Sequence, residues 1–485
     1  MAFLPISWGL RLNKWLIRAF MAKSLHSWWK SKSLRDGNTG QFLDDEARQS
    51  LLSPKNNGLL LDGLNGRLTD DASFRNLAMI ATTGAGKTSS FIVPNLLTLD
   101  NCSIVATDPS GTLFERTSGD LKRRGYTVLK LDPTNLSESI GFNPLDRANT
   151  YPAMQELAHI LVKTASQGGK PDPFWTSGAE DILAVLIKCL KNHPNAKTYA
   201  NLANLQYLLN NFGNGKPLIE FVAAFAPDEQ TYQGFKGFIS QETKIMQGMA
   251  SQAKSALSIL SDPDIGRLTA ESSFDFTRLR REKIALFLTI PQNRISYYSL
   301  LASMWYTQLF HFCLDDSQYQ ANSLPIYFLL DEFGHLTIPD FGSIITTTRA
   351  RRISLAFVIQ SISQLEERYG KQGAKTILTG GVASQLYFPG MDIDTATDLS
   401  RILGDVMHEH YSPLGGIRRE KEALMTPAAL RAMPDNQVLY LFANKRPTIL
   451  NVTPFYEKRD FIKRTQTPPV QVQGIQAGKV QFVGL

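Results

Sequence analysis

Residues 78–97 read AMIATTGAGKTSSFIVPNLL, an apolar run followed by a glycine-containing loop and a second apolar stretch. The loop fits the phosphate-binding pattern G-x-x-x-x-G-K-[ST] except at its first position, where Ala81 replaces glycine. Glycines let successive backbone N–H groups turn toward a phosphate, and the amino end of the following helix adds favourable partial charge. Ala81 lies where the strand ends, a position that does not require a glycine-only conformation. The pattern therefore predicts a phosphate-binding loop between a strand and a helix.

This loop predicts ATP and Mg²⁺ as cofactors. Lys87 would reach the β- and γ-phosphates as a catalytic residue, and the hydroxyl of Thr88 would hold Mg²⁺. The residues expected to bind ATP are Thr83, Gly84, Ala85, Gly86, Lys87, Thr88 and Ser89.

The other strand-like runs predict an α/β fold, a doubly wound domain with a mostly parallel central sheet. Most of the runs are continuously apolar rather than alternating, which is typical of strands buried on both faces, and helical patterns separate several of them. The runs cover residues 77–81, 102–107, 127–131, 283–290, 325–330, 353–360, 384–388 and 437–443.

The domain organisation follows from where these runs stop. Between about residue 150 and residue 275 the pattern is helical, which predicts an all-helical domain inserted between the third strand and the fourth. Residues 466–485 have few large apolar side chains and predict a flexible tail. The predicted units are a basic arm (1–35), two parts of a nucleotide-binding domain (36–150 and 276–465), the helical insertion (151–275) and the tail (466–485).

Composition agrees with a globular protein larger than one average domain. The chain has 485 residues, of which 43% are hydrophobic and 20% charged. Its three cysteines lie singly in apolar runs, which favours buried thiols in a reducing compartment. Residues 1–35 hold seven of the 51 basic residues and no acidic one, which leaves 44 of each sign elsewhere. The net charge of +7 therefore gives no evidence that the body binds DNA.

The basic arm also holds four of the six tryptophans, Trp8, Trp15, Trp28 and Trp29. On a helix its basic and apolar side chains would form two faces, which suits the surface of an anionic membrane. The alternative is that the arm packs on the protein's own body or on a partner. Charges interrupt the arm too often for it to span a bilayer.

A second apolar run, residues 327–332 (YFLLDE), ends in two carboxylates. An ATPase needs one acid to orient hydrated Mg²⁺ and another to activate water, so Asp331 suits the metal and Glu332 the general base.

Two further elements extend the predicted site. The run 353–360 ends in Gln360, which would contact the γ-phosphate and the attacking water or would simply terminate the strand. Residues 346–352 (TTTRARR) are either a solvated basic patch or the source of an arginine finger, a guanidinium that crosses a subunit interface to stabilise charge on the transferred phosphoryl group.

The chain resembles the coupling ATPases of type IV secretion and conjugation, the TraG/TraD-like coupling proteins. The likeness covers roughly residues 58–455, with the matching stretches in the same order. They are TTGAGKTSSFIVPNLL (82–97), VATDPSGTLFERTSGDLKRRGYTVLKLDP (105–133), FNPL (142–145), DPFW (172–175), FLLDEFGHL (328–336), VIQSISQLEERYG (358–370) and DIDTATDLSRILGD (392–405).

This resemblance implies a RecA-like motor domain, a cytosol-facing helical domain and a homo-hexamer, with Arg349 as the finger contributed in trans. It implies coupling of ATP hydrolysis to the delivery of DNA, a relaxase or protein effectors to components of a type IV secretion channel. Family members usually begin with transmembrane helices. Here the arm predicts peripheral attachment at the cytoplasmic face of the bacterial inner membrane, and the alternative is that another protein supplies the membrane part. Ser110 stands where the family usually has a basic residue.

Two other functions remain open from the sequence. One is a double-stranded DNA translocase for chromosome segregation or repair, which DPFW and the helical insertion disfavour. The other is a cargo receptor that binds ATP mainly to assemble, which Lys87, Asp331 and Glu332 disfavour.

Overall fold

The computed structural model describes residues 40–165, 172–213, 216–411, 417–475 and 478–485. The basic arm and its predicted membrane contact lie outside the described residues. Among the described helices, none combines the length and the apolar character needed to cross a bilayer.

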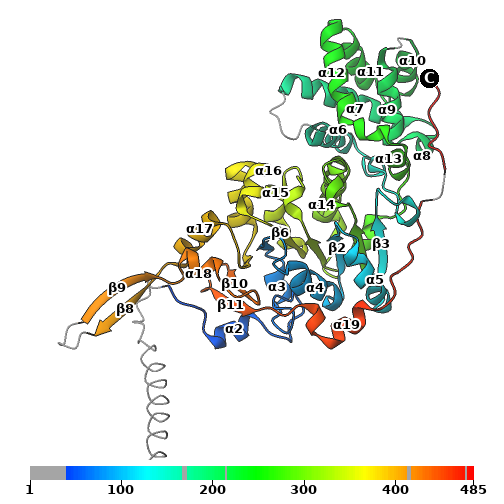
Figure 1. Cartoon of the computed structure of the whole chain (residues 1–485). Helices are drawn as coiled ribbons and strands as arrows, with labels where there is room; N and C mark the ends of the chain where they lie inside the picture. Colours follow the sequence, from blue (N-terminus) through cyan, green and yellow to red (C-terminus); the bar gives the residue numbers. More distant parts are fainter. Residues whose placement is uncertain (1–39, 166–171, 214–215, 412–416, 476–477) are drawn as a thin grey trace, which may run out of the picture.

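A nine-stranded sheet forms the centre of the molecule, in the order β11-β10-β7-β1-β6-β5-β2-β4-β3 (Figure 1). The seven strands from β7 to β3 are parallel, whereas β10 and β11 pair antiparallel at one edge. The strands are β1 (Leu77–Ile80), β2 (Ser103–Thr107), β3 (Thr127–Leu131), β4 (Ile284–Leu288), β5 (Ile326–Leu330), β6 (Ile353–Ile359), β7 (Ser384–Tyr387), β10 (Gln437–Phe442) and β11 (Thr448–Asn451).

Successive residues of the strands enter two different hydrophobic cores. In β1, Leu77 and Met79 pack on one face of the sheet, while Ala78 and Ile80 pack on the other. Helices α4 (Val93–Thr98) and α5 (Thr112–Arg123) cover the first face, and α14 (Ser299–Leu314), α15 (Phe341–Thr347) and α16 (Ile362–Lys375) cover the second. Coverage of both faces explains why the strands read as continuous apolar runs, and the predicted α/β fold class is confirmed.

The described chain between β3 and β4 is helical and contains no strand. Figure 1 shows this helical region at one end of the molecule, next to α14. Its helices are α6 (Tyr151–Ala165), α7 (Pro173–Asn192), α8 (Ala196–Tyr199), α9 (Leu202–Asn210), α10 (Lys216–Phe225), α11 (Glu229–Ile239), α12 (Thr243–Ala256) and α13 (Pro263–Leu268).

Every predicted strand is present, but three further strands were missed. β8 (Asp405–Tyr411) and β9 (Ile417–Ala423) form a separate antiparallel hairpin that projects from the body (Figure 1). Their sequences, DVMHEHY and IRREKEA, contain too many charged residues to look like buried strands. β11 has only four residues.

The described residues after α19 (Arg459–Thr465), which the sequence predicts to be a flexible tail, contact the body of the protein. The backbone N–H of Val470 donates to Ser118 Oγ at 3.1 Å, and that of Ile475 donates to the carbonyl of Leu136 at 2.9 Å. On α9, Asn204 donates to the carbonyl of Gln481 and accepts from the N–H of Val483. Val483 is also buried, so both backbone hydrogen bonds and side-chain packing attach parts of this segment to the body.

Candidate nucleotide-binding site

The phosphate-binding loop connects β1 to a π-helical turn (Thr88–Ile92) that continues into α4. Gly84 and Gly86 both have φ of 83°, in the left-handed region that favours glycine. A Cβ added at Gly84 would meet no atom within 4 Å, so the space in front of the loop is open. Ala81 is absent from the residues with positive φ, and its N–H donates to the carbonyl of Ile359 at 3.0 Å. Ala81 therefore still pairs as strand, and glycine is not needed there.

Two polar pairs join the loop to the end of β5. Lys87 Nζ lies 2.8 Å from Glu332 Oε1, and the hydroxyl of Thr88 donates to Asp331 Oδ2 at 2.8 Å. Lys87 and Asp331 are each only 6% exposed. The structure thus brings together the lysine, the hydroxyl and both carboxylates that the sequence predicted for one site.

Glu332 is held in an uncommon backbone conformation next to two further polar side chains. Its φ is 56°, in the left-handed region, where a residue with a Cβ is strained. Gln360 Nε2 donates to Glu332 Oε2 at 3.4 Å, so Gln360 belongs to the same cluster. His335 Nε2 lies 3.7 Å from Glu332 Oε2, is buried and has no hydrogen-bond partner in the described part of the chain. His335 was not predicted as a site residue, although it lies within the FLLDEFGHL stretch.

Burial changes the acidity of two neighbouring aspartates. It raises the pKa of Asp331, and this effect outweighs the opposing influence of Lys87 and Thr88. Asp108 follows β2, the strand next to β5, and burial raises its pKa to about 6. Asp108 Oδ2 accepts from the N–H of Phe114 at 2.7 Å, while its buried Oδ1 has no partner among the described residues. Asp108 was not predicted, because its position beside Asp331 depends on the strand order.

The remaining loop residues lie as expected around this cluster. Ser89 Oγ donates to the carbonyl of Gly86 at 3.0 Å, which closes the first turn after Lys87. Thr83, Gly84, Ala85 and Gly86 line a cavity that opens beside the loop.

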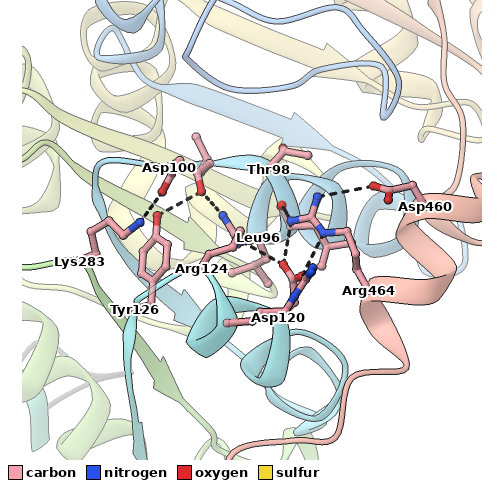
Figure 2. Close-up of polar contacts among 12 residues, drawn as sticks. Leu96, Thr98, Asp100, Asp120, Arg124, Tyr126, Lys283, Asp460 and Arg464 are labelled. Atoms are coloured by element: carbon pink, nitrogen blue, oxygen red, sulfur yellow. Dashed lines mark hydrogen bonds and ion pairs between the residues drawn. The ribbon is translucent and has the colours of Figure 1, made fainter.

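Figure 2 shows how the far end of α4 is fixed. Arg124 donates to the carbonyls of Leu96 and Leu99, and Arg464 of α19 donates to the carbonyl of Leu97. Both arginines also contact Asp120, at 2.9 Å for Arg124 Nε and 2.7 Å for Arg464 Nη2. Positive charge at the carboxyl end of a helix is favourable, so this cluster holds the helix that follows the loop.

Arg349 does not join the site within one chain. It precedes β6, whereas Lys87 follows the carboxyl end of the parallel strand β1, so the two residues lie at opposite edges of the sheet. Arg349 is exposed, and its Nη2 lies 2.9 Å from Asp71 Oδ1.

Curated relatives match most of this chain at low identity. VirD4 from Rhizobium radiobacter is 26% identical over 398 residues, which cover 79% of this chain and 57% of the relative. TraG from Escherichia coli is 23% identical over 354 residues, which cover 67% of this chain and 54% of the relative. The chain therefore spans little more than half the length of the relatives it matches.

Solved structures of the conjugative coupling protein TrwB share the fold. TrwBdeltaN70 in complex with sulphate aligns with a TM-score of 0.68 at 18% identity, over 91% of this chain and 99% of that one. TrwB in complex with ADP and Mg²⁺ aligns with a TM-score of 0.67 at 17% identity, over 90% and 97%. The family model described as Type IV secretory system conjugative DNA transfer matches residues 44–477. This match covers most of the chain, and the protein belongs to that family.

Proposed function

We propose that this chain is the ATP-driven coupling protein of a type IV secretion or conjugation system. It recruits a relaxase–DNA complex or protein effectors and uses ATP hydrolysis to deliver them to the secretion channel. The observation that carries the proposal is the convergence of Lys87, Thr88, Asp331 and Glu332 at one edge of the sheet. Membership of the conjugative DNA transfer family supports the choice of cargo and channel.

The residues present fit ATP with Mg²⁺. The loop is open in front of Gly84, the Lys87 ammonium lies at its end, and the pair Thr88–Asp331 offers a hydroxyl and a carboxylate oxygen, which are ligands that Mg²⁺ prefers. The related fold of TrwB in complex with ADP and Mg²⁺ supports this fit. ATP with Mg²⁺ would supply the phosphoryl bond whose hydrolysis drives the motor.

Each side chain of the cluster has a role that follows from its position. Lys87 is paired with Glu332, so a bound phosphate would compete for the ammonium and free the carboxylate. Glu332 would then accept the proton of the attacking water, and Gln360, which already contacts Glu332, would orient that water. Thr88 and Asp331 would hold the metal.

A complete site would need a second subunit. Arg349 lies at the sheet edge opposite Lys87 and is exposed, a placement that suits a guanidinium offered to the neighbour's site in a homo-hexamer. The working location is the cytoplasmic face of the inner membrane, with the basic arm at the anionic surface.

ATP hydrolysis by the purified chain tests the proposal. The rate is measured with no nucleic acid, with single-stranded DNA and with duplex DNA, and Glu332→Gln serves as the blank. We expect hydrolysis that DNA stimulates and that Glu332→Gln lowers by about 10²-fold or more, because general-base catalysis is lost while ATP binding remains. A hydrolysis rate that only duplex DNA stimulates would favour a double-stranded DNA translocase. A hydrolysis rate that DNA does not change would favour a cargo receptor. Undiminished turnover by Glu332→Gln would refute the general-base assignment.

A further inference from the structure

Residues 478–485 lie along the helical region, next to α9 and α13 (Figure 1). Asn204 and Tyr207 of α9 and Gly266 of α13 lie against this segment. We propose that these three residues form a docking surface for an extended peptide of a partner protein, and that the chain's own residues 478–485 occupy this surface as a displaceable ligand. This inference goes beyond the proposed function and does not depend on ATP hydrolysis.

Asn204 contacts the backbone of the segment rather than a side chain. Its Nδ2 donates to the carbonyl of Gln481 at 3.0 Å, and its Oδ1 accepts from the N–H of Val483 at 2.8 Å. One amide group therefore pairs with two main-chain groups, two residues apart. Every residue except proline carries both of these groups, so many peptide sequences can make the same pair of bonds.

Asn201 holds the Asn204 amide in the orientation that this contact needs. Asn201 Oδ1 accepts from the backbone N–H of Asn204 at 3.0 Å and from its Nδ2 at 3.1 Å. Asn204 is fully buried, whereas the other buried residues of α9 are all apolar. A buried amide costs stability unless it is hydrogen-bonded, and among the described residues only Val483 donates to its Oδ1. The placement of Asn204 thus points to the binding of a peptide backbone.

Few side chains of the segment take part in the contact. Val483 is the only buried residue of 478–485. The ring of Phe482 lies 5.1 Å from that of Tyr207 but is exposed. A Cβ added at Gly484 would meet no atom within 4 Å. A partner peptide would therefore need an aliphatic side chain and a backbone N–H at the position of Val483, and it has wide freedom elsewhere.

The small number of attachments makes the segment displaceable. Two hydrogen bonds to Asn204 and one buried valine hold residues 478–485, and the preceding backbone attachment is the bond from Ile475 to Leu136. Segments with few buried contacts open at low free-energy cost. Because the segment is tethered, it competes with an external peptide at an effective concentration of about millimolar. It would therefore exclude weakly binding peptides and yield to tighter ones.

The test adds a labelled peptide with the sequence of residues 478–485, GKVQFVGL, to the full chain and measures its affinity by fluorescence anisotropy. Wild type is compared with Val483→Asp and Val483→Gly, which remove the aliphatic side chain with and without an added charge. Gln481→Ala is the matched control, because Gln481 is exposed and its backbone carbonyl makes the contact with Asn204. Unfolding temperatures of all variants verify folding.

Both Val483 variants should bind the peptide at least about tenfold more tightly than wild type and Gln481→Ala, because their own segment no longer competes. For these variants, a peptide methylated at the backbone nitrogen of Val483 should bind about tenfold more weakly, since Asn204 Oδ1 then loses its donor. A peptide that combines Lys479→Ala and Gln481→Ala should bind like the unmodified peptide, because Asn204 contacts only the backbone.

Equal peptide affinities of wild type and the folded Val483 variants, or no binding to any of them, would overturn the inference. A methylated peptide that binds as tightly as the unmodified one would exclude the role of Asn204. Loss of binding by the peptide with two alanines would show that the surface fits only the chain's own segment, and would overturn the docking of a partner. The ATPase measurements above test the proposed function separately from all of these results.

Discussion

Replacing Asp120 with asparagine tests how the helix after the phosphate-binding loop is held. Asp120 is fully buried and contacts Arg124 and Arg464, which are only 17% exposed (Figure 2). It also contacts the more exposed Arg123. Asparagine has the same shape but no charge, so Arg124 loses the carboxylate at 2.9 Å and Arg464 keeps only its longer contact with the exposed Asp460, at 3.7 Å. Removing one partner of a buried ion pair costs about 3–5 kcal/mol. The amide oxygen and the backbone carbonyls still accept hydrogen bonds, so we expect a loss of stability at the low end of this range, about 3 kcal/mol.

Thermal unfolding measures this cost. At about 2 °C per kcal/mol for a large unit, the unfolding temperature of Asp120→Asn should fall by about 6 °C. Asp100→Asn is the matched control in the same region, because Asp100 pairs with Lys283 at 2.8 Å but is 53% exposed. An exposed pair contributes less than about 1 kcal/mol, so the control should shift by at most about 2 °C. Equal shifts in the two variants would refute the reasoning.

The pH dependence gives a second readout of the same pair. Burial alone would raise the pKa of Asp120, but hydrogen bonds from Arg464 and Arg123 and the nearby positive charges outweigh it and lower the pKa. A carboxylate whose folded pKa is depressed stabilises the fold fully above its unfolded pKa of about 3.9 and loses that contribution as the pH falls through the folded pKa. The difference in unfolding temperature between wild type and Asp120→Asn should therefore stay constant from pH 8 to about pH 5 and disappear only in stronger acid. A difference in unfolding temperature that disappears near neutral pH would contradict a lowered pKa of Asp120.

Three further predictions concern the site and the arm. Lys87→Ala should lose ATP binding, measured by calorimetry, because the ammonium that would contact the β- and γ-phosphates is gone; retained affinity would remove that role. Mixtures of Arg349→Ala and Lys87→Ala subunits should recover part of the hydrolysis rate if Arg349 acts in trans, since some interfaces then pair an intact Lys87 with an intact Arg349; no recovery at any ratio would argue against the finger. Deleting residues 1–35 should release the protein from anionic liposomes in a flotation assay, and unchanged binding would exclude the arm as the anchor.

The sequence predicted those features whose signal is local. Continuous apolar runs identified the parallel strands, and Lys87, Thr88, Asp331 and Glu332 were recognised because each ends or follows such a run. The domain boundaries and the roles of these residues remain predictions that the experiments above address.

The sequence could not show contacts between distant segments. Asp108 lies next to Asp331 only because β2 pairs with β5, and Tyr456 reaches the cavity beside the phosphate-binding loop from a segment far from Thr83 along the chain. The contacts of the tail also involve distant segments, while its flexibility stays a prediction. Its partners, Ser118, Leu136 and Asn204, bond its backbone, and backbone bonding leaves no pattern in side-chain hydrophobicity.

The segment after α19 connects α4 to the helical region. Arg464 fixes its start against α4, and Asn204 of the helical region fixes its end through Gln481 and Val483. The few residues between Ile475, bonded to Leu136, and Gln481 span at most about 20 Å when fully extended. A displacement of the helical region away from the sheet by more than that reach would therefore break the hydrogen bond at Leu136 or those at Asn204.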